Sequence, residues 1–269
     1  MEKKNQSPEP ARPQTVKNID AEKPVLEHVR ELRKRLMICA GTVLLLAFFF
    51  LAVLGDALMK LVTAPVNALG IQFVYVGLAE ALTSQMKVAL IAALILSAPV
   101  ILWQIWQFVR PGLFPNEQKN VLLFGAVSLF LFILGVVFGY GIVFLAAITF
   151  FVSVGQNFAT PMLSIDSYVN FLLGFVVPFG VAFQLPVALY FLARAGLVNG
   201  AMLVSGRRYA ILLIAIVSAI LTPPDVLSQL LMAGPLIVLY EVGVRVVQYT
   251  EKRRAEAFKP APHPGNDLS

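Results

Sequence analysis

Two carboxylates that flank long apolar runs are the first candidates for chemistry in this sequence. Glu31 lies just before the first apolar run with Arg35 four residues later, and Glu117 lies shortly before the third apolar run. Their ordinary roles are an i,i+4 ion pair for Glu31 and stabilisation of a helix N-terminus for Glu117. If both lie at one membrane face, each could instead accept a guanidinium in bidentate fashion.

Three polar side chains lie inside apolar runs, where ionisable groups are functional candidates. For Lys87 we expect the long stem to reach the outer interface. Glu241 lies four residues before Arg245, which favours an ion pair between them. For Gln184 the alternatives are a hydrogen bond between helices and a functional position on a concave face.

Other residue types exclude several kinds of site. The single cysteine, Cys39, lies in an apolar run and is expected to pack there, and the two histidines are too few for a histidine-based metal site. The sequence has no G-x-x-x-x-G-K-[ST] phosphate loop, no G-x-S-x-G elbow and no H-E-x-x-H helix. We therefore expect no catalytic residue, no metal and no enzyme. Trp103, Trp106 and Phe108 are typical of an aromatic belt at the membrane interface.

The composition indicates a membrane protein. Hydrophobic residues make up 58% of the 269 positions and charged residues only 13%, whereas soluble domains carry about 25% charged residues. A spanning helix needs about 20 apolar residues. We expect an all-α integral membrane protein with six transmembrane helices near 37–55, 80–108, 121–150, 168–193, 209–221 and 227–247.

The ends of the chain and the last two segments have distinct character. Residues 1–24 predict a disordered cytoplasmic tail, 25–248 a six-helix transmembrane domain that opens with an amphipathic helix, and 249–269 a cytoplasmic C-terminal tail. We expect the first apolar run to stay in the protein and not to be a cleaved signal peptide. Segment 209–221 is short and 227–247 is split by Gly234-Pro235, which predicts a short hairpin. We expect kinks at Pro99, Pro178, Pro186 and Pro235, and a concave bundle.

Basic residues set the expected topology. All 21 Lys and Arg residues except Lys60 and Lys87 fall in the N-terminal region, the turns near 110–119 and 194–208, or the C-terminal region. Positive loops stay inside, so both termini are expected in the cytoplasm and Glu31 and Glu117 share one face. The net charge of +6 is therefore explained by a membrane, and no nucleic-acid partner is expected.

Five stretches resemble the TatC family, the multispanning subunit of the twin-arginine protein translocase. The run from Glu27 to Leu36 is similar to the family's H-x-x-E-L-R-x-R-L start of helix one. The run from Phe108 to Leu113 with Glu117 resembles its first cytoplasmic loop, and the run from Leu221 to Gln229 resembles its turn between helices five and six. The stretches 97–100 and 183–187 also fit, so the resemblance covers roughly residues 25–247 in register.

The resemblance implies a function and a set of site residues. Family members receive folded precursors whose signal peptides carry two consecutive arginines, and the receptor site maps to Glu31, Glu117, Arg33, Phe108 and Pro111. The resemblance also implies a polar patch at Thr222, Pro223 and Gln229 where single-span partner subunits of the TatA and TatB type dock, and important extracytoplasmic positions at Pro65 and Asp225. Many relatives carry Glu where this chain has Gln184.

We therefore expect the receptor and scaffold subunit of a twin-arginine translocase in the cytoplasmic (inner) membrane. The resemblance implies an oligomeric complex in the lipid bilayer, export driven by the proton-motive force and no cofactor. The alternative is a secondary transporter of a small solute, which needs a site at the midplane, usually between repeats with broken helices. Binding of a paired-Arg peptide would separate the two hypotheses.

Overall fold

The computed structural model describes residues 22–68, 70–110, 121–155 and 162–257. Long apolar runs form the central parts of the helices, because a helix satisfies its own backbone hydrogen bonds away from water. The helices and π-helical turns are α1 (Glu22–Phe49), η1 (Phe50–Leu54), α2 (Gly55–Asn67), α3 (Glu80–Val109), α5 (Val121–Phe138), η3 (Gly139–Phe144), α6 (Leu145–Gly155), α7 (Ile165–Ala182), α8 (Leu185–Arg194), α9 (Gly200–Ser205), α10 (Arg207–Leu221) and α11 (Val226–Ala257). Two short strands, β1 (Gln72–Val74) and β2 (Met162–Ser164), pair in parallel.

The described part of the chain contains five helical stretches that are long and apolar enough to cross a membrane, at Val29–Asn67, Glu80–Val109, Leu122–Gly155, Ile165–Arg194 and Val226–Arg253. The predicted fifth segment corresponds to α10, which has 15 residues. At 1.5 Å per residue α10 is about 22 Å long, short of a hydrocarbon core of about 30 Å. The all-α membrane architecture is thus confirmed, with α10 too short to count among the full-length spans.

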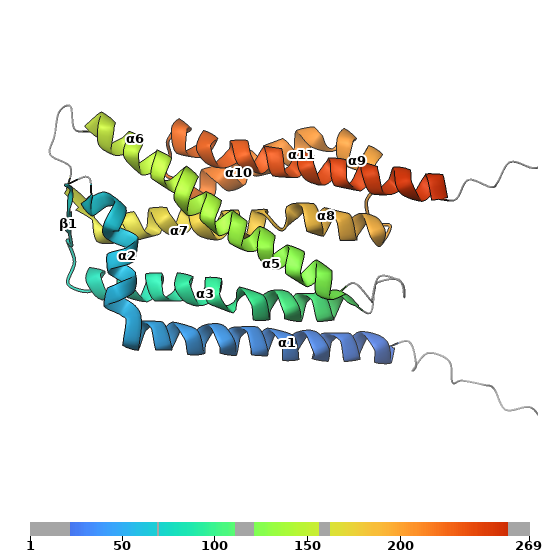
Figure 1. Cartoon of the computed structure of the whole chain (residues 1–269), viewed down its shortest axis with the longest axis horizontal. Helices are drawn as coiled ribbons and strands as arrows, with labels where there is room; N and C mark the ends of the chain where they lie inside the picture. Colours follow the sequence, from blue (N-terminus) through green and yellow to red (C-terminus); the bar gives the residue numbers. More distant parts are fainter. Residues whose placement is uncertain (1–21, 69, 111–120, 156–161, 258–269) are drawn as a thin grey trace, which may run out of the picture.

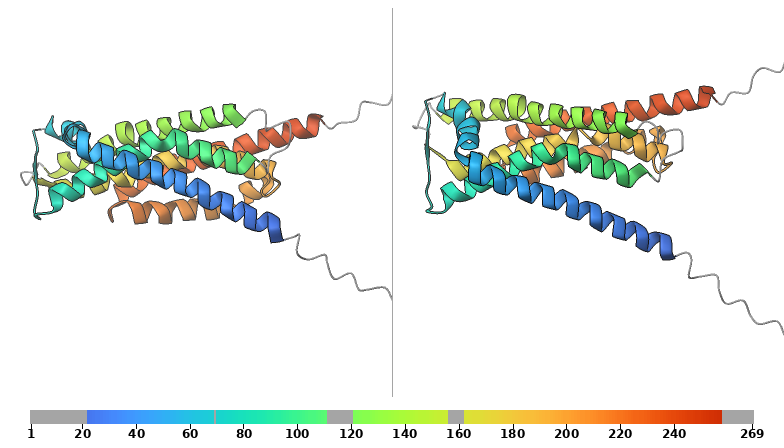
Figure 2. Two further views of the ribbon diagram at one scale, coloured as in Figure 1. Left: turned by 90° about the horizontal axis from the view of Figure 1, so that it is seen from below. Right: turned by 60° about the horizontal axis from the view of Figure 1, so that its bottom comes forward.

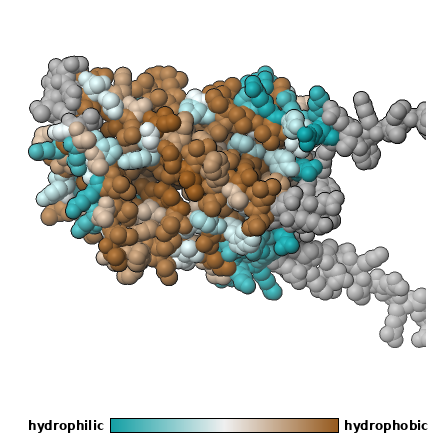
Figure 3. Space-filling model, in the orientation of Figure 1, coloured by the Kyte–Doolittle hydropathy of each residue, from teal (hydrophilic) through white to brown (hydrophobic). Residues whose placement is uncertain are grey.

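The bundle has two distinct ends. The strands β1 and β2 lie at one end, which we call the strand end, and the start of α1 and the end of α11 lie at the opposite end, the terminal end (Figures 1 and 2). On the face that Figure 3 shows, the surface between the two ends is mostly apolar, and hydrophilic residues gather at both ends. The first and last described helical residues therefore lie on the same side, as the distribution of Lys and Arg predicts.

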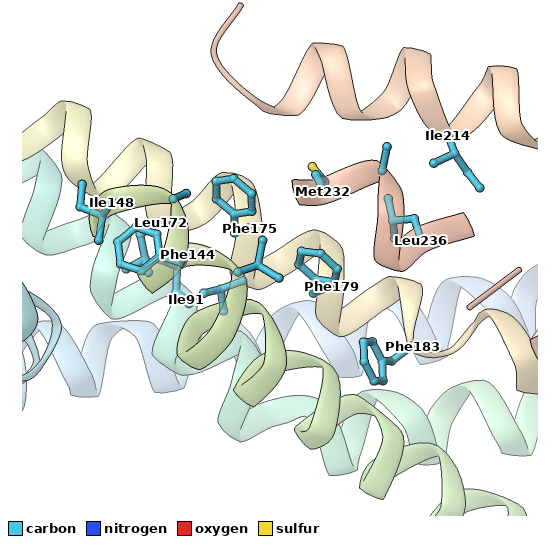
Figure 4. Packing of buried hydrophobic residues seen from close by; sticks show 14 of the residues in the cluster. Ile91, Phe144, Ile148, Leu172, Phe175, Phe179, Phe183, Ile214, Met232 and Leu236 are labelled. Carbon is cyan, nitrogen blue, oxygen red and sulfur yellow. The ribbon is translucent and has the colours of Figure 1, made fainter. Parts of the chain in front are cut away.

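The core lies where α5, η3, α7 and α11 meet. Phe144, Phe175, Phe179 and Met232 are fully buried there (Figure 4). Helices α5 and α7 approach closely because Gly135 has no side chain: a Cβ at this position would lie 2.5 Å from the carbonyl oxygen of Phe179. Small residues at such crossings are the usual means of helix association in a membrane.

Several elements differ from the sequence-based expectation. The amphipathic helix and the first apolar segment form one helix, α1, since no helix breaker separates them. Helix α2 then turns across the strand end (Figure 1). The fourth span breaks at Phe183 and Gln184, shortly before Pro186. By contrast, α11 has 32 residues and continues without a break through Pro235. The hairpin of α10 and α11 is nevertheless short on the side of the strand end, because its turn does not reach as far as β1 (Figures 1 and 2).

Candidate functional site

A polar cluster ties α1 to α3 at the terminal end, and we call Glu31, Arg35, Gln104 and Gln107 the Arg35 cluster. The Arg35 Nε donates to Glu31 Oε1 at 3.0 Å, and Arg35 Nη2 donates to the same oxygen. Arg35 Nη1 donates to Gln104 Oε1 at 3.1 Å and to Gln107 Oε1 at 2.8 Å. The Glu31–Arg35 ion pair predicted from the i,i+4 spacing is confirmed.

Helical spacing explains how the Arg35 cluster assembles. Gln104 and Gln107 are three residues apart and so share one face of α3, as Glu31 and Arg35 share one face of α1. The Arg35 side chain is 17% exposed and the Glu31 side chain 36%. The guanidinium therefore lies within the α1–α3 interface, and the carboxylate lies at its rim.

The other residues that the resemblance assigns to the receptor site are only partly described. Arg33 is exposed and two residues from Glu31, which places it about 200° around α1. Phe108 is half-buried in the last turn of α3. Pro111 and Glu117 lie outside the described residues, so the pairing of Glu31 with Glu117 at one site stays a prediction.

The turn between α10 and α11 is a second polar site. Asp225 Oδ1 accepts from the backbone N–H of Ser228 at 2.7 Å, which caps the start of α11. Gln229 Nε2 donates to the Ala215 carbonyl of α10 at 3.2 Å. Thr222 is buried and its hydroxyl donates to the Ser218 carbonyl, whereas Pro223 is exposed.

Three buried polar atoms at this turn make no hydrogen bond within the part of the chain that the structure describes. They are Ser218 Oγ, Asp225 Oδ2 and Ser228 Oγ. Both serines are 0% exposed. A buried hydroxyl without a partner costs about 1–3 kcal/mol. We call Ser218, Thr222, Asp225, Ser228 and Gln229 the hairpin patch, which holds buried hydrogen-bonding groups that the described residues leave unpartnered.

Gln184 makes the hydrogen bond between helices that the sequence allowed. Its Nε2 donates to the Ser128 carbonyl of α5 at 2.9 Å. Trp106 Nε1 donates to the Ser128 hydroxyl at 3.1 Å, so α3, α5 and the α7–α8 break meet at one serine. Gln184 also lines an apolar hollow of about 350 Å³ between α3, α5 and α7. Gln184 therefore holds helices together through a hydrogen bond, a role that needs no charge at this position.

The belt interpretation of the aromatic residues is wrong for Trp106, which is only 5% exposed. Its ring packs against Phe191 with centroids 4.5 Å apart and stacks on Phe124 at 5.8 Å. Trp103 is 41% exposed and remains compatible with a belt. The buried Ser128 hydroxyl accounts for the difference, because it gives the indole N–H a partner away from water.

Two ion pairs join different helices, and one of them replaces a pair expected within a single helix. Glu241 pairs with Arg207 of α10, so the expected pair with Arg245 is wrong. The Lys87 Nζ donates to Asp166 and, at 2.8 Å, to Asn170 of α7. Lys87 therefore joins two helices at the strand end.

The strand end holds further residues that sequence reasoning missed. Glu80 Oε1 accepts from the Ser164 hydroxyl and from the Asp166 N–H at 3.1 Å, and its other oxygen accepts two backbone N–H groups from the segment before α3. These Glu80 hydrogen bonds fix β2 and α7 against α3.

Pro65, which the resemblance implies to be an important position, lies inside α2 next to the fully buried Val66. Within the described ranges no group of three or more His, Cys, Asp or Glu residues could hold a metal ion.

Comparisons with known proteins agree with this arrangement. Residues 27–235 match the family model described as TatC, Sec-independent protein translocase protein. A protein of Carboxydothermus hydrogenoformans named Sec-independent protein translocase protein TatC is 39% identical over 233 residues, covering 85% of this chain and 94% of the relative. A Helicobacter pylori protein of the same name is 38% identical over 235 residues, covering 87% and 88%.

A solved structure described as the twin arginine translocase receptor TatC is also similar. It superposes with a TM-score of 0.76 at 35% identity, covering 81% of this chain and 97% of the solved chain. The match covers most of the described helices, and the 35% sequence identity is higher than that of proteins that share only a fold. These comparisons favour a protein translocase component over a small-solute transporter. The chain is a multi-pass membrane protein and belongs to the TatC family of Sec-independent protein translocase proteins.

Proposed function

We propose that this chain is the signal-receptor and scaffold subunit of a twin-arginine translocase. In this proposal the terminal end faces the cytoplasm, the chain lies in the cytoplasmic (inner) membrane, and Glu31 accepts an arginine of a paired-Arg signal peptide. The solved relative is itself described as a twin arginine translocase receptor. Nothing in this role requires a cofactor, and transport would draw on the proton-motive force.

One observation carries the proposal: the Glu31 carboxylate already binds a guanidinium, that of Arg35. The acid is 36% exposed at the rim of the α1–α3 interface, so a peptide arginine can approach it. A guanidinium presents a planar fork of donors, whereas a lysine ammonium is a compact point charge. This chemistry fits a receptor that distinguishes paired arginine from paired lysine.

Glu117, Arg33, Phe108 and Pro111 complete the proposed receptor site. The exposed position of Arg33 fits contact with the peptide or with lipid headgroups rather than with Glu31. Phe108 lies in the last turn of α3, the helix that carries Gln104 and Gln107, and offers an apolar surface next to the polar cluster. Glu117 would supply a second carboxylate for the second arginine.

The hairpin patch is the proposed docking site for single-span partner subunits of the TatA and TatB type. Docking would shift the turn between α10 and α11 and uncover the Ser218 and Ser228 hydroxyls and the Asp225 Oδ2, which are buried in the isolated chain. The hydroxyls would then donate or accept hydrogen bonds across the interface, and the carboxylate oxygen would accept one. The short α10 gives a thinned edge that a partner helix could cover. Exposed Pro223 would belong to this docking site together with Thr222 and Gln229. The strand-end residue Pro65 would belong to the extracytoplasmic surface of the complex.

Export of a folded reporter behind a paired-Arg signal tests the receptor role. Glu31→Gln and Glu117→Ala should each lower export at least about tenfold, since a charged hydrogen bond is worth about 1.5–3 kcal/mol. Glu241→Gln is the matched control, because Glu241 is 35% exposed and also pairs with an arginine. Wild-type export by both receptor variants at normal membrane abundance would refute the proposal.

A further inference from the structure

We propose that Arg35 is an internal competitor for the Glu31 carboxylate, which it occupies until an arginine of the signal peptide displaces it. This inference rests on the proposed function, because it takes Glu31 as the acceptor of the peptide arginine. It adds a regulatory role for Arg35 and a supporting role for Gln104 and Gln107.

The Arg35 guanidinium binds as a ligand would. Two of its nitrogens, Nε and Nη2, donate to one carboxylate oxygen of Glu31, and the third, Nη1, donates to Gln104 and Gln107. The guanidinium thus reproduces on Glu31 the kind of bond that a peptide arginine would form. Any peptide arginine that uses the same oxygen must first displace two Arg35 hydrogen bonds.

The two glutamines make this displacement inexpensive. A charge left buried without a partner is strongly destabilising, and the Arg35 side chain is only 17% exposed. The side-chain oxygens of Gln104 and Gln107 lie 3.1 and 2.8 Å from Nη1, so they continue to accept from Arg35 after Glu31 has changed partner. The exchange then replaces one guanidinium on the carboxylate by another, which keeps peptide binding reversible.

Exposure sets the direction of approach. Glu31 is the more exposed member of the pair and Arg35 the more buried, so the peptide reaches the acid from outside while Arg35 stays within the α1–α3 interface. Competition of this kind lowers the affinity of every peptide by the same factor. It therefore raises the affinity that a sequence needs before it occupies the site, and weak cationic peptides stay unbound.

The test is the dissociation constant of a paired-Arg and a paired-Lys signal peptide for the purified full chain in lipid nanodiscs. Arg35→Gln should tighten binding of both peptides by one common factor of about three to ten, the value of a partly exposed ion pair. Arg35→Lys, which keeps the charge but loses the fork, should give a smaller gain. Lys34→Gln is the control for charge, since this exposed lysine is adjacent on α1, and it should change binding less than twofold.

The glutamines provide a second arm. Gln104→Met combined with Gln107→Met should weaken peptide binding in the wild-type background and have no effect in the Arg35→Gln background. If Arg35 only holds α1 against α3, Arg35→Gln will weaken binding or leave it unchanged, and the inference is overturned while the receptor role stands. If Glu31→Gln leaves the affinity for the paired-Arg peptide unchanged, the receptor role of Glu31 fails and the competitor role fails with it.

Discussion

Removing two buried hydroxyls of the hairpin patch should change the stability of the chain and its binding of a partner in opposite directions. Ser218 and Ser228 are 0% exposed, and their Oγ atoms have no hydrogen-bond partner among the described residues. A hydroxyl in that position costs about 1–3 kcal/mol. The lower end applies in a membrane, where hydrogen bonds between helices average about 0.6 kcal/mol. We expect Ser218→Ala and Ser228→Ala each to stabilise the isolated chain by about 1 kcal/mol.

The same substitutions should weaken docking of a single-span partner. A partner that satisfies both hydroxyls loses about 1 kcal/mol for each hydrogen bond removed, and the gain in the free chain adds to that loss. The double variant should therefore bind the partner at least about tenfold more weakly. The assays are thermal unfolding of the purified chain and co-purification with the partner subunit from native membranes.

Ser84→Ala is the matched control for both assays. Ser84 is also 0% exposed with an unpartnered Oγ, but it lies in α3, away from the hairpin patch. Its replacement should stabilise the chain to a similar degree and leave partner binding unchanged. Lower stability of the Ser218 and Ser228 variants would show that the isolated chain already satisfies these hydroxyls, and a partner would then have nothing to gain from them.

Three further predictions concern packing, the strand end and topology. Gly135→Val should lower the yield of folded protein in detergent by several fold, because its Cβ would lie 2.5 Å from the Phe179 carbonyl; normal yield and melting would contradict the close α5–α7 approach. Lys87→Met should destabilise the chain by about 1 kcal/mol, since Asp166 then loses a partly exposed ion-pair partner, and unchanged thermal unfolding would count against this pair. A reporter fused after the last residue should be active in the cytoplasm and one inserted near Gln156 should be exported; an exported C-terminal reporter would reverse the proposed orientation.

Much of the fold could be predicted because it depends on patterns along one helix. The apolar runs predicted the helices, and the i,i+4 spacing predicted the Glu31–Arg35 pair. The distribution of Lys and Arg predicted that the start of α1 and the end of α11 lie at the same end of the bundle (Figure 1). The strands could not be predicted in this way. Each has three residues, and their partners, such as Phe73 and Leu163, lie about 90 positions apart in the sequence.

The misassigned side chains share one physical cause. Spacing along a helix identifies neighbours on that helix and says nothing of the residues that other helices bring close. Glu241 therefore pairs with Arg207, 34 positions away, instead of the nearer Arg245. Trp106 is buried because Ser128 of α5 provides its hydrogen-bond partner. The Arg35 cluster depends equally on a second helix, and no spacing within α1 indicates that glutamines of α3 hold the guanidinium.

A double-mutant cycle between Glu31 and each arginine of the signal peptide measures whether the carboxylate binds the peptide directly. Peptide affinity would be measured for wild-type and Glu31→Gln protein with each peptide arginine retained or replaced by glutamine. We expect a coupling energy of at least about 1.4 kcal/mol, a factor of ten, between Glu31 and one of the arginines, and coupling near zero for the Glu241→Gln control. Additive effects for both arginines would contradict direct recognition by Glu31.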